Sequence, residues 1–357
     1  MNGDKSGRIE KLALDSLPDG SYADFTNRPN KTIPKAVEGV ENDDIVFLSL
    51  INNRLAKIDG LERFKKVKRL DLRANQIVQI EGLAHMSDLQ ELDLYENYLE
   101  EVKNLPFPKL ILLDLSFNQI RSLPEDVFST LPNLRELYLV QNKIKVIGNW
   151  FTPLKDTLET LELGANRIRT IENLHELTNL RNLWLGKNKI VEISGLDSLK
   201  NLRILSLQNN RLTSISKGLM CLEQLEELYL SENKIEKIEH LETLTNLRTL
   251  DIGMNVVRVV EGITTLTNVE ELWLNNNAVE HMRDIEAIKE LPKLKTLYLE
   301  HNPVASDPQY RNKVVMLAPG IQQVHVTIPI YLIYFVYLYI YIYIYIYIYL
   351  YIVSDLL

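Results

Sequence analysis

The feature of this sequence that most constrains its fold is a six-residue pattern, leucine–any–leucine–any–any–asparagine, which returns in phase twelve times. The asparagines that close the twelve copies are Asn53, Asn75, Asn97, Asn118, Asn142, Asn166, Asn188, Asn210, Asn233, Asn255, Asn277 and Asn302. They are 21 to 25 residues apart, and in one copy Ile252 replaces the second leucine. A period of this length is typical of repeat architectures, in which each unit packs only on its neighbours.

The pattern predicts one short strand in every unit. Because side chains alternate along a strand, both leucines point to one side, which we expect to face the core. The asparagine follows where the strand ends, and its amide can bond to backbone groups of the turn, so we expect the stacked asparagines to form a ladder. We therefore expect an α/β repeat solenoid with a parallel concave sheet and a convex side of short helices or 3-10 turns. Two units are longer, and we expect a fuller helix between Pro124 and Leu131 and an irregular segment around Trp150.

The sequence around the repeats predicts how the two ends of the stack are organised. Residues 1–40 are polar and lack a sustained period, so we expect disorder there, with at most a short helix near Ile9 to Leu17. The twelve repeats occupy residues 41–302. Residues 303–327 are expected to cap the last repeat, with a helix around Val314 to Leu317.

Four positions in each unit are expected to face the concave side, namely the residue before the first leucine, the residue between the leucines and the two before the asparagine. Acidic side chains occupy twelve of these positions: Asp71, Glu91, Asp93, Glu96, Asp114, Glu136, Glu162, Glu227, Glu232, Asp251, Glu271 and Glu300. Basic side chains occupy three: Arg69, Arg73 and Lys187. The remaining positions include the aromatic side chains Tyr95, Phe117, Tyr138, Trp184, Tyr229, Trp273 and Tyr298. Exposed tryptophans are enriched at binding hot spots, so we predict a concave face that binds a folded protein with a basic surface.

Composition and motifs argue against catalysis and against nucleic acid. The single cysteine, Cys221, excludes an internal disulfide and a cysteine zinc site, and it fits a reducing compartment. The formal net charge is −8, whereas a phosphate-backbone binder needs a clustered basic surface, so we expect no nucleic-acid partner. Common signatures of nucleotide, hydrolase and metalloprotease sites are absent, and the six histidines fall in different units. We therefore expect no enzyme activity, no cofactor and no metal.

The repeat unit resembles the short, 22-residue subfamily of leucine-rich repeats. The segments LDLYENYLEEVKNL, LELGANRIRTIENL, LWLGKNKIVEISGL and LYLEHNPVASDPQYRNKV resemble the leucine-rich-repeat regulatory subunit of type 1 serine/threonine protein phosphatase, regulatory subunit 7, and the similarity runs over residues 38–324. The resemblance implies a curved horseshoe and a non-catalytic subunit that binds the phosphatase catalytic subunit in nucleus and cytoplasm. We expect a monomer before the complex forms. Because many intracellular adaptors share the repeat, a ciliary or cytoskeletal adaptor is an alternative function.

The same resemblance implies which residues contact the partner, because acidic and aromatic residues of the family's concave face grip the catalytic subunit. Matched position by position, this role falls on Asp114, Tyr138, Glu162, Trp184, Glu271, Trp273 and Tyr298. Tyr138 and Trp184 stand where the family often has phenylalanine, and both keep an aromatic ring. The two longer units depart from the family's near-uniform spacing.

Residues 328–357 alternate tyrosine with isoleucine and contain ten of the seventeen tyrosines. Ile328 to Val353 is long enough to span a bilayer, which makes a membrane-tethered leucine-rich-repeat protein the second alternative. However, each tyrosine hydroxyl would need a partner in hydrocarbon, and tyrosine normally gathers at membrane interfaces. The alternation also fits translation of a TA-repeat nucleotide tract. We therefore interpret this low-complexity tail as a gene-model or splice artefact.

Overall fold

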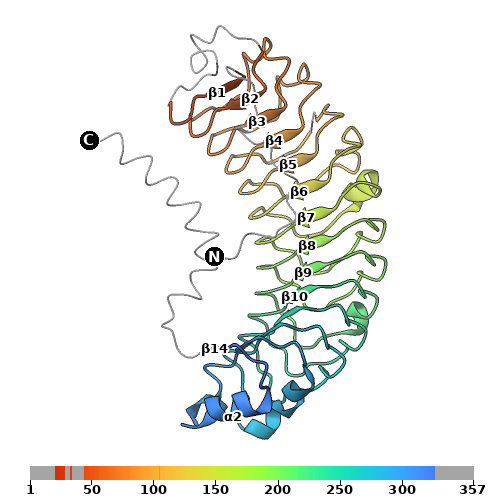
Figure 1. Ribbon diagram of the computed structural model, residues 1–357. Helices are drawn as coiled ribbons and strands as arrows, with labels where there is room; N and C mark the ends of the chain where they lie inside the picture. Colours follow the sequence, from red (N-terminus) through yellow and green to blue (C-terminus); the bar gives the residue numbers. More distant parts are fainter. Residues whose placement is uncertain (1–20, 29–32, 34–43, 104, 326–357) are drawn as a thin grey trace, which may run out of the picture.

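The computed structural model describes residues 21–28, 33, 44–103 and 105–325. Within these residues, fourteen short strands form one parallel sheet in which each strand is hydrogen-bonded to the next along the chain. The strands are β1 Tyr22–Asp24, β2 Phe47–Ser49, β3 Arg69–Asp71, β4 Glu91–Asp93, β5 Leu112–Asp114, β6 Glu136–Tyr138, β7 Thr160–Glu162, β8 Asn182–Trp184, β9 Ile204–Ser206, β10 Glu227–Tyr229, β11 Thr249–Asp251, β12 Glu271–Trp273, β13 Thr296–Tyr298 and β14 Gln323–His325. Figure 1 shows the resulting curved solenoid, so the predicted α/β repeat solenoid is confirmed.

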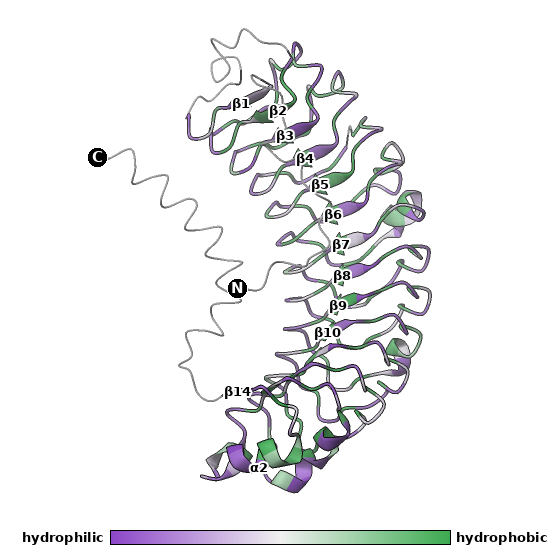
Figure 2. Cartoon of the chain, in the orientation of Figure 1, coloured by the Kyte–Doolittle hydropathy of each residue, from purple (hydrophilic) through white to green (hydrophobic). Residues whose placement is uncertain are grey.

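The core of the solenoid is a column of leucines. The middle residue of every strand from β2 to β13 is a leucine with no exposed surface. Leu70 pairs in register with Leu92, and Leu92 pairs with Leu113, so the column continues from one unit to the next. Figure 2 shows the alternation of apolar and polar residues along each turn that the pattern predicts. Each fully buried leucine contributes roughly 1.5–3 kcal/mol, so the column holds neighbouring units together.

The asparagine of each unit links that unit to the one before it. At Asn166, the side-chain Nδ2 donates to the carbonyls of Leu139, at 2.8 Å, and Leu163, at 3.0 Å. Its Oδ1 accepts from the backbone N–H of Ile144 at 3.1 Å. The asparagines therefore form the predicted ladder because each side chain bonds to the backbone of two units. They satisfy polar groups that the ends of the strands leave unpaired.

The residue before each of the twelve ladder asparagines adopts a left-handed backbone, with φ between 52° and 59°. This conformation turns the chain so that its N–H bonds to the next unit, as Gln141 N does to the carbonyl of Gly164 at 2.9 Å. None of the twelve residues is a glycine, and Phe117 and Met254 are among them. A non-glycine residue there costs about 1–2 kcal/mol, which the hydrogen bonds between repeats offset.

The N-terminal segment, predicted to be disordered to residue 40, is ordered at β1, so the prediction is wrong there. β1 pairs in parallel with β2 and extends the sheet by one turn. Ala23 and Phe25 take the places of the two leucines and are buried, while Arg28 stands where the asparagine would stand. Because all three defining residues are replaced, the leucine–asparagine pattern does not match this turn. The short helix expected near residues 9–17 lies outside the described residues.

The convex side carries turns and 3-10 helices. In the two longer units, the helix lies in the second unit and not in the first, where we predicted it. Residues 125–130 form turns in place of the predicted helix, whereas η2, Asn149–Leu154, is a 3-10 helix where we expected an irregular segment. The rings of Phe128 and Phe151 stack with centroids 6.0 Å apart, so they fill the extra space between the two units. The other convex 3-10 helices are η3 Lys217–Leu219 and η4 Met282–Glu290.

The C-terminal end of the core is closed by η5, Pro303–Ser306, and by the helix α2, Tyr310–Leu317, which contacts η4 and η5. α2 buries Tyr310 and Val314, so the predicted cap helix is confirmed. Across the described residues, no helix has both the length and the apolar composition needed to cross a bilayer. The tyrosine- and isoleucine-rich tail, residues 328–357, lies outside the described residues.

Candidate functional site: the concave face

The residue after the buried leucine of each strand belongs to one row across the concave face. In this row Asp114 pairs in register with Tyr138, Tyr138 with Glu162, and Glu162 with Trp184. These four predicted contact residues are therefore neighbours on consecutive strands, β5 to β8, about 4.8 Å apart. All four are partly exposed, so they form a continuous surface of alternating acidic and aromatic side chains.

The other three predicted contact residues form a second group near the C-terminal end. Glu271 and Trp273 are on β12, and Tyr298 is on β13. The rings of Trp273 and Tyr298 meet edge to face with centroids 5.2 Å apart. Burial raises the pKa of the Tyr298 hydroxyl, and the nearby charge of Glu271 raises it further, so this hydroxyl stays a hydrogen-bond donor. Strands β9 to β11 separate this group from the first.

Tyr229, on β10, bridges the two groups. Its ring stacks on Trp184 with centroids 6.2 Å apart and meets Trp273 edge to face at 6.4 Å. Its hydroxyl donates to Glu227 Oε2 at 2.7 Å, and burial together with that carboxylate raises its pKa. We call Trp184, Tyr229, Trp273 and Tyr298 the aromatic platform. Tyr229 is absent from the seven residues that the resemblance implied, although it shares their pattern position.

Two small row residues make room for the platform. Ser206 and Asp251 lie between the aromatic residues in register and are 0% and 6% exposed. The backbone N–H of Gly253 donates to Asp251 Oδ1 at 3.0 Å. Burial raises the pKa of Asp251 to about 6. Both residues are therefore covered and leave the surface of the row to the aromatic rings on the neighbouring strands.

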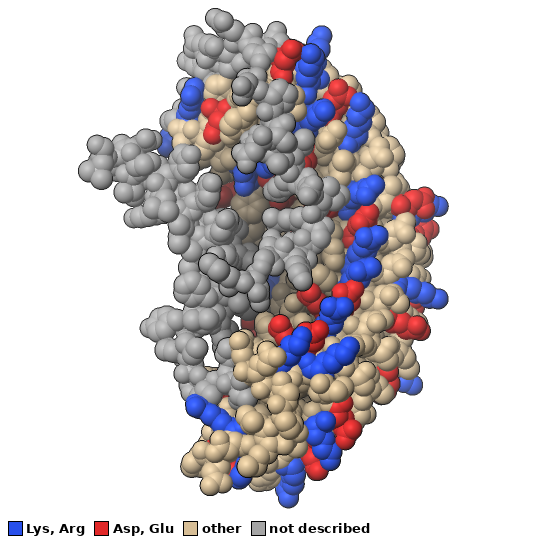
Figure 3. All heavy atoms as spheres, viewed as in Figure 1, with Lys and Arg blue, Asp and Glu red and all other residues tan. Residues whose placement is uncertain are grey.

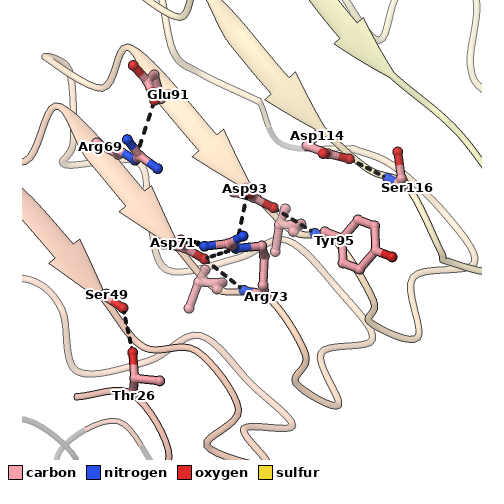
Figure 4. A network of polar contacts seen from close by, with 12 residues as sticks. Thr26, Ser49, Arg69, Asp71, Arg73, Glu91, Asp93, Tyr95, Asp114 and Ser116 are labelled. Atoms are coloured by element: carbon pink, nitrogen blue, oxygen red, sulfur yellow. Dashed lines mark hydrogen bonds and ion pairs between the residues drawn. The ribbon is translucent and has the colours of Figure 1, made fainter. Parts of the chain in front are cut away.

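The N-terminal half of the face carries three aspartates in register, Asp71, Asp93 and Asp114, which we call the acidic end. Arg73 donates its Nε to Asp71 Oδ1 at 2.9 Å and its Nη2 to Oδ2 at 2.7 Å, and its Nε lies 3.4 Å from Asp93 Oδ2 (Figure 4). Burial, followed by the charges of Asp71 and Asp114, raises the pKa of Asp93 well above its usual value. Arg73 thus bridges Asp71 and Asp93, and the backbone N–H of Ser116 donates to Asp114 Oδ1 at 2.8 Å.

Three of the twelve acids expected on the concave side are not exposed. Asp71, Glu136 and Asp251 are buried. Glu136 accepts a hydrogen bond from the hydroxyl of Tyr138 at 2.6 Å, so it orients that ring. Because strands lie so close together, longer side chains on neighbouring strands cover the shorter or inward-turned carboxylates.

The first unit adds an aromatic cluster that the sequence analysis missed. The rings of Tyr22 and Phe47 have centroids 4.8 Å apart, and the Arg69 guanidinium lies 4.5 Å above Phe47. Arg69 also lies 3.4 Å from Glu91. Phe47 occupies the position before the first leucine of its unit, so the pattern could have predicted it on the concave face. Tyr22 belongs to the overlooked turn. The concave face therefore has aromatic side chains at both ends.

A polar groove of about 380 Å³ lies on a lateral side of the solenoid, away from the row. Arg135 and Arg181, which line it, share Glu159 at 3.3 and 3.6 Å, and Arg203 pairs with Glu226 at 3.1 Å. Figure 3 shows such interspersed basic and acidic side chains along the side in view. Exposed pairs of this kind contribute little to stability, typically about 0–1 kcal/mol. We call this row of paired charges the paired ladder.

No cluster of three or more histidine, cysteine, aspartate or glutamate side chains in the described part of the chain is arranged to hold a metal ion. The partly exposed row and the platform have the composition of a protein-binding surface. Half-buried tryptophan and tyrosine rings held by mutual contacts supply apolar area with little loss of side-chain entropy. The surrounding carboxylates favour a basic partner surface.

Models of repeat families match this chain over most of the solenoid. A family described as "Leucine-rich repeat" matches residues 219–326, one described as "Leucine rich repeat" matches residues 108–168, and one described as "Leucine Rich repeats (2 copies)" matches residues 156–198 and 178–219. Together with the parallel solenoid, these matches show that the chain is a leucine-rich-repeat protein.

Among curated proteins, the chain is 41% identical over 77 residues to the "Protein phosphatase 1 regulatory inhibitor subunit PPP1R7 homolog" of Arabidopsis thaliana, which covers 22% of this chain and 23% of that protein. It is 45% identical over 40 residues to human protein phosphatase 1 regulatory subunit 7, which covers 11% of each chain. It is also 41% identical over 70 residues to human leucine-rich repeat-containing protein 3B, or 19% of this chain and 27% of that protein. The aligned segments thus span about a quarter or less of these relatives.

Solved structures share the fold. An internalin, InlF, from Listeria monocytogenes superposes with a TM-score of 0.61 at 24% identity, covering 80% of this chain and 88% of that one. The leucine-rich-repeat protein LIC12759 of Leptospira interrogans superposes with a TM-score of 0.64 at 22% identity, covering 85% and 95%. Similarity at this level of identity supports the solenoid and says nothing of function.

Proposed function

We propose that this protein is a non-catalytic regulatory subunit that binds the catalytic subunit of type 1 serine/threonine protein phosphatase through its concave face. The observation that carries the proposal is the row of Asp114, Tyr138, Glu162 and Trp184 on adjacent strands, continued by the aromatic platform. The proposed complex forms from a monomeric repeat subunit, in nucleus and cytoplasm.

The chemistry of the face supports a partner that is folded and basic. The acidic end places three aspartates beside one arginine, Arg73, and Glu162 and Glu271 add partly exposed carboxylates beside the aromatic rings. Such a surface steers a basic partner and gives the rings a place to anchor it. The local similarity to phosphatase 1 regulatory subunits in Arabidopsis thaliana and human supports this choice of partner.

Binding of the purified phosphatase catalytic subunit to the full chain, measured by isothermal titration calorimetry, tests the proposal. We expect the double variant Glu271→Ala/Trp273→Ala to bind at least about thirtyfold more weakly, because loss of a central hot spot costs about 2 kcal/mol or more. Tyr298 then loses the ring it packs against.

The matched control is Tyr98→Ala/Glu100→Ala, which also removes one aromatic and one acidic side chain. Both residues are exposed and lie after the asparagine ladder, outside the concave face. This control is expected to bind as the wild type does. Absence of binding by the wild type, or equal losses in both double variants, would overturn the proposal.

A further inference from the structure

Five basic side chains form a column along a lateral side of the solenoid, outside the concave face. Lys143, Arg167, Lys189, Arg211 and Lys234 each directly follow a ladder asparagine in five consecutive units. Arg167, Arg211 and Lys234 are exposed, and the other two are partly exposed. We call these five residues the basic column.

Backbone hydrogen bonds hold the members of the column side by side. The N–H of Arg167 donates at 2.8 Å to the carbonyl of Ile144, the residue that follows Lys143. The same 2.8 Å bond recurs for the other members: Lys189 to Ile168, Arg211 to Ile190 and Lys234 to Leu212. The five basic residues therefore follow one another along the solenoid, about one strand spacing or roughly 4.8 Å apart at the backbone.

The charges of the column are not neutralised within the described part of the chain. No carboxylate there lies within ion-pairing distance of a column residue. Lys143 instead donates to the amide oxygen of Gln119 at 2.6 Å. Beside the column, Arg121, Lys145 and Arg169 are exposed and widen its first part.

The paired ladder shows that such a column is not a necessary result of the repeat. There, Arg135 and Arg181 share Glu159, and Arg203 has Glu226. The same fold therefore places paired charges in one column and unpaired charges in another. A column of like charges repels itself, so it gains stability when an anionic ligand binds.

We propose that the basic column binds an extended, acidic polypeptide segment of a partner protein. The column narrows toward Lys189 and Lys234, because Glu232 and Glu236 stand two residues before and after Lys234, and Glu192 stands three residues after Lys189. A broad anionic surface, such as a duplex or a bilayer, would meet these carboxylates. An extended polypeptide with repeated acidic side chains can contact the basic column without meeting the flanking carboxylates. The column also lacks the aromatic side chains on which single-stranded nucleic acids stack.

The test uses a fluorescein-labelled oligoglutamate peptide and the full chain, with binding measured by fluorescence anisotropy at low and physiological salt. The variant Arg167→Gln/Arg211→Gln removes two column charges, and the matched control Arg181→Gln/Arg203→Gln removes two charges from the paired ladder. The column variant is expected to bind at least about tenfold more weakly, and the control within about twofold of the wild type. All four residues are exposed, so both variants are expected to keep the wild-type unfolding midpoint.

Three results would overturn the inference. The first is no saturable binding of the peptide by the wild type. The second is an equal loss in both variants, which would show a response to net charge alone. The third is tighter binding of a single-stranded oligonucleotide, or of phosphatidylserine-containing vesicles, than of the peptide. Since the column lies apart from the concave face, failure here leaves the phosphatase proposal intact.

Discussion

The indole of Trp184 stacks on the phenol of Tyr229 with ring planes inclined by 21°, although strand β9 lies between them. The rings meet because Ser206, the residue between them in register, is small and fully buried. The small side chain of Ser206 thus lets aromatic residues on non-adjacent strands meet and form the platform. The shape of this surface therefore depends on a residue that is itself buried.

Replacing Ser206 with leucine is expected to separate the two rings. The larger side chain needs the space beneath them, which costs about 1–3 kcal/mol in stability and lowers affinity for the partner. Near-ultraviolet circular dichroism is expected to lose the signal of the Trp184–Tyr229 pair. Ser206→Ala is the control, since it leaves the stack in place. An unchanged spectrum in the leucine variant would contradict the role assigned to Ser206.

Loss of one ladder asparagine is expected to weaken the solenoid at its centre. Asn166→Ala leaves the N–H of Ile144 and the carbonyls of Leu139 and Leu163 without their side-chain partner. At about 1–3 kcal/mol for each buried group left unpaired, we expect a total of about 2–4 kcal/mol after partial rescue by water. Urea unfolding followed by circular dichroism measures this loss. A similar loss for exposed Asn149→Ala would show that the effect is not specific to the ladder.

Asp251 is expected to make stability depend on pH. Its pKa is raised from 3.8 to about 6, so the folded protein holds the proton more tightly than the unfolded chain does. Stability contributed by this group is present below about pH 4 and is lost as pH rises to about 6, with a penalty of about 3 kcal/mol above that. Asp251→Asn keeps an acceptor for Gly253 and removes the penalty.

The Asp251→Asn variant is therefore expected to be more stable than the wild type above pH 6, with the difference vanishing near pH 4. Unfolding midpoints in urea across this range measure it. The control, Asp197→Asn, changes an exposed aspartate and is expected to show no such trend. A difference that stays constant with pH would contradict the assignment.

Arg73 is expected to be indispensable at the acidic end. Arg73→Met leaves Asp71 and Asp93 without their counter-charge, and because Arg73 itself is 39% exposed, we expect a cost below the roughly 3–5 kcal/mol of a fully buried pair at neutral pH. Because burial and neighbouring charges already raise the pKa of Asp93, part of the loss is expected to be recovered as pH falls. Arg73→Lys keeps the charge but loses the bidentate contact with Asp71, so its stability is expected to lie between those of the wild type and Arg73→Met. A loss that does not change with pH would argue against this electrostatic explanation.

The repeat pattern predicted the strands, the leucine column and the asparagine ladder because each depends on residues a fixed distance apart. It missed β1, where alanine and phenylalanine replace the leucines and Arg28 replaces the asparagine. It also gave no sign of the left-handed residue before each asparagine. That conformation is imposed by hydrogen bonds between units, so the residue there need not be glycine.

The sequence predicted which residues of the candidate site lie on the concave sheet, but not how deeply each side chain is buried. Alternation along a strand identified which side chains leave the core, and therefore placed Trp184 and Trp273 among the partly exposed residues of the concave sheet. Burial of Asp71 and Asp251 depends on the side chains of neighbouring strands, which one unit of sequence does not reveal. The bridging role of Tyr229 likewise follows only from the small residues on either side of it.

Site-specific photo-crosslinking tests most directly whether the concave face binds the phosphatase. A benzoylphenylalanine in place of Tyr298 lies on the platform, and one in place of Tyr98 lies outside the concave face on an exposed site. Mixed with the purified type 1 catalytic subunit and irradiated, the protein labelled at position 298 is expected to form a crosslinked heterodimer, and the one labelled at 98 is not. Crosslinking from position 98 alone, or from neither position, would contradict binding through the concave face.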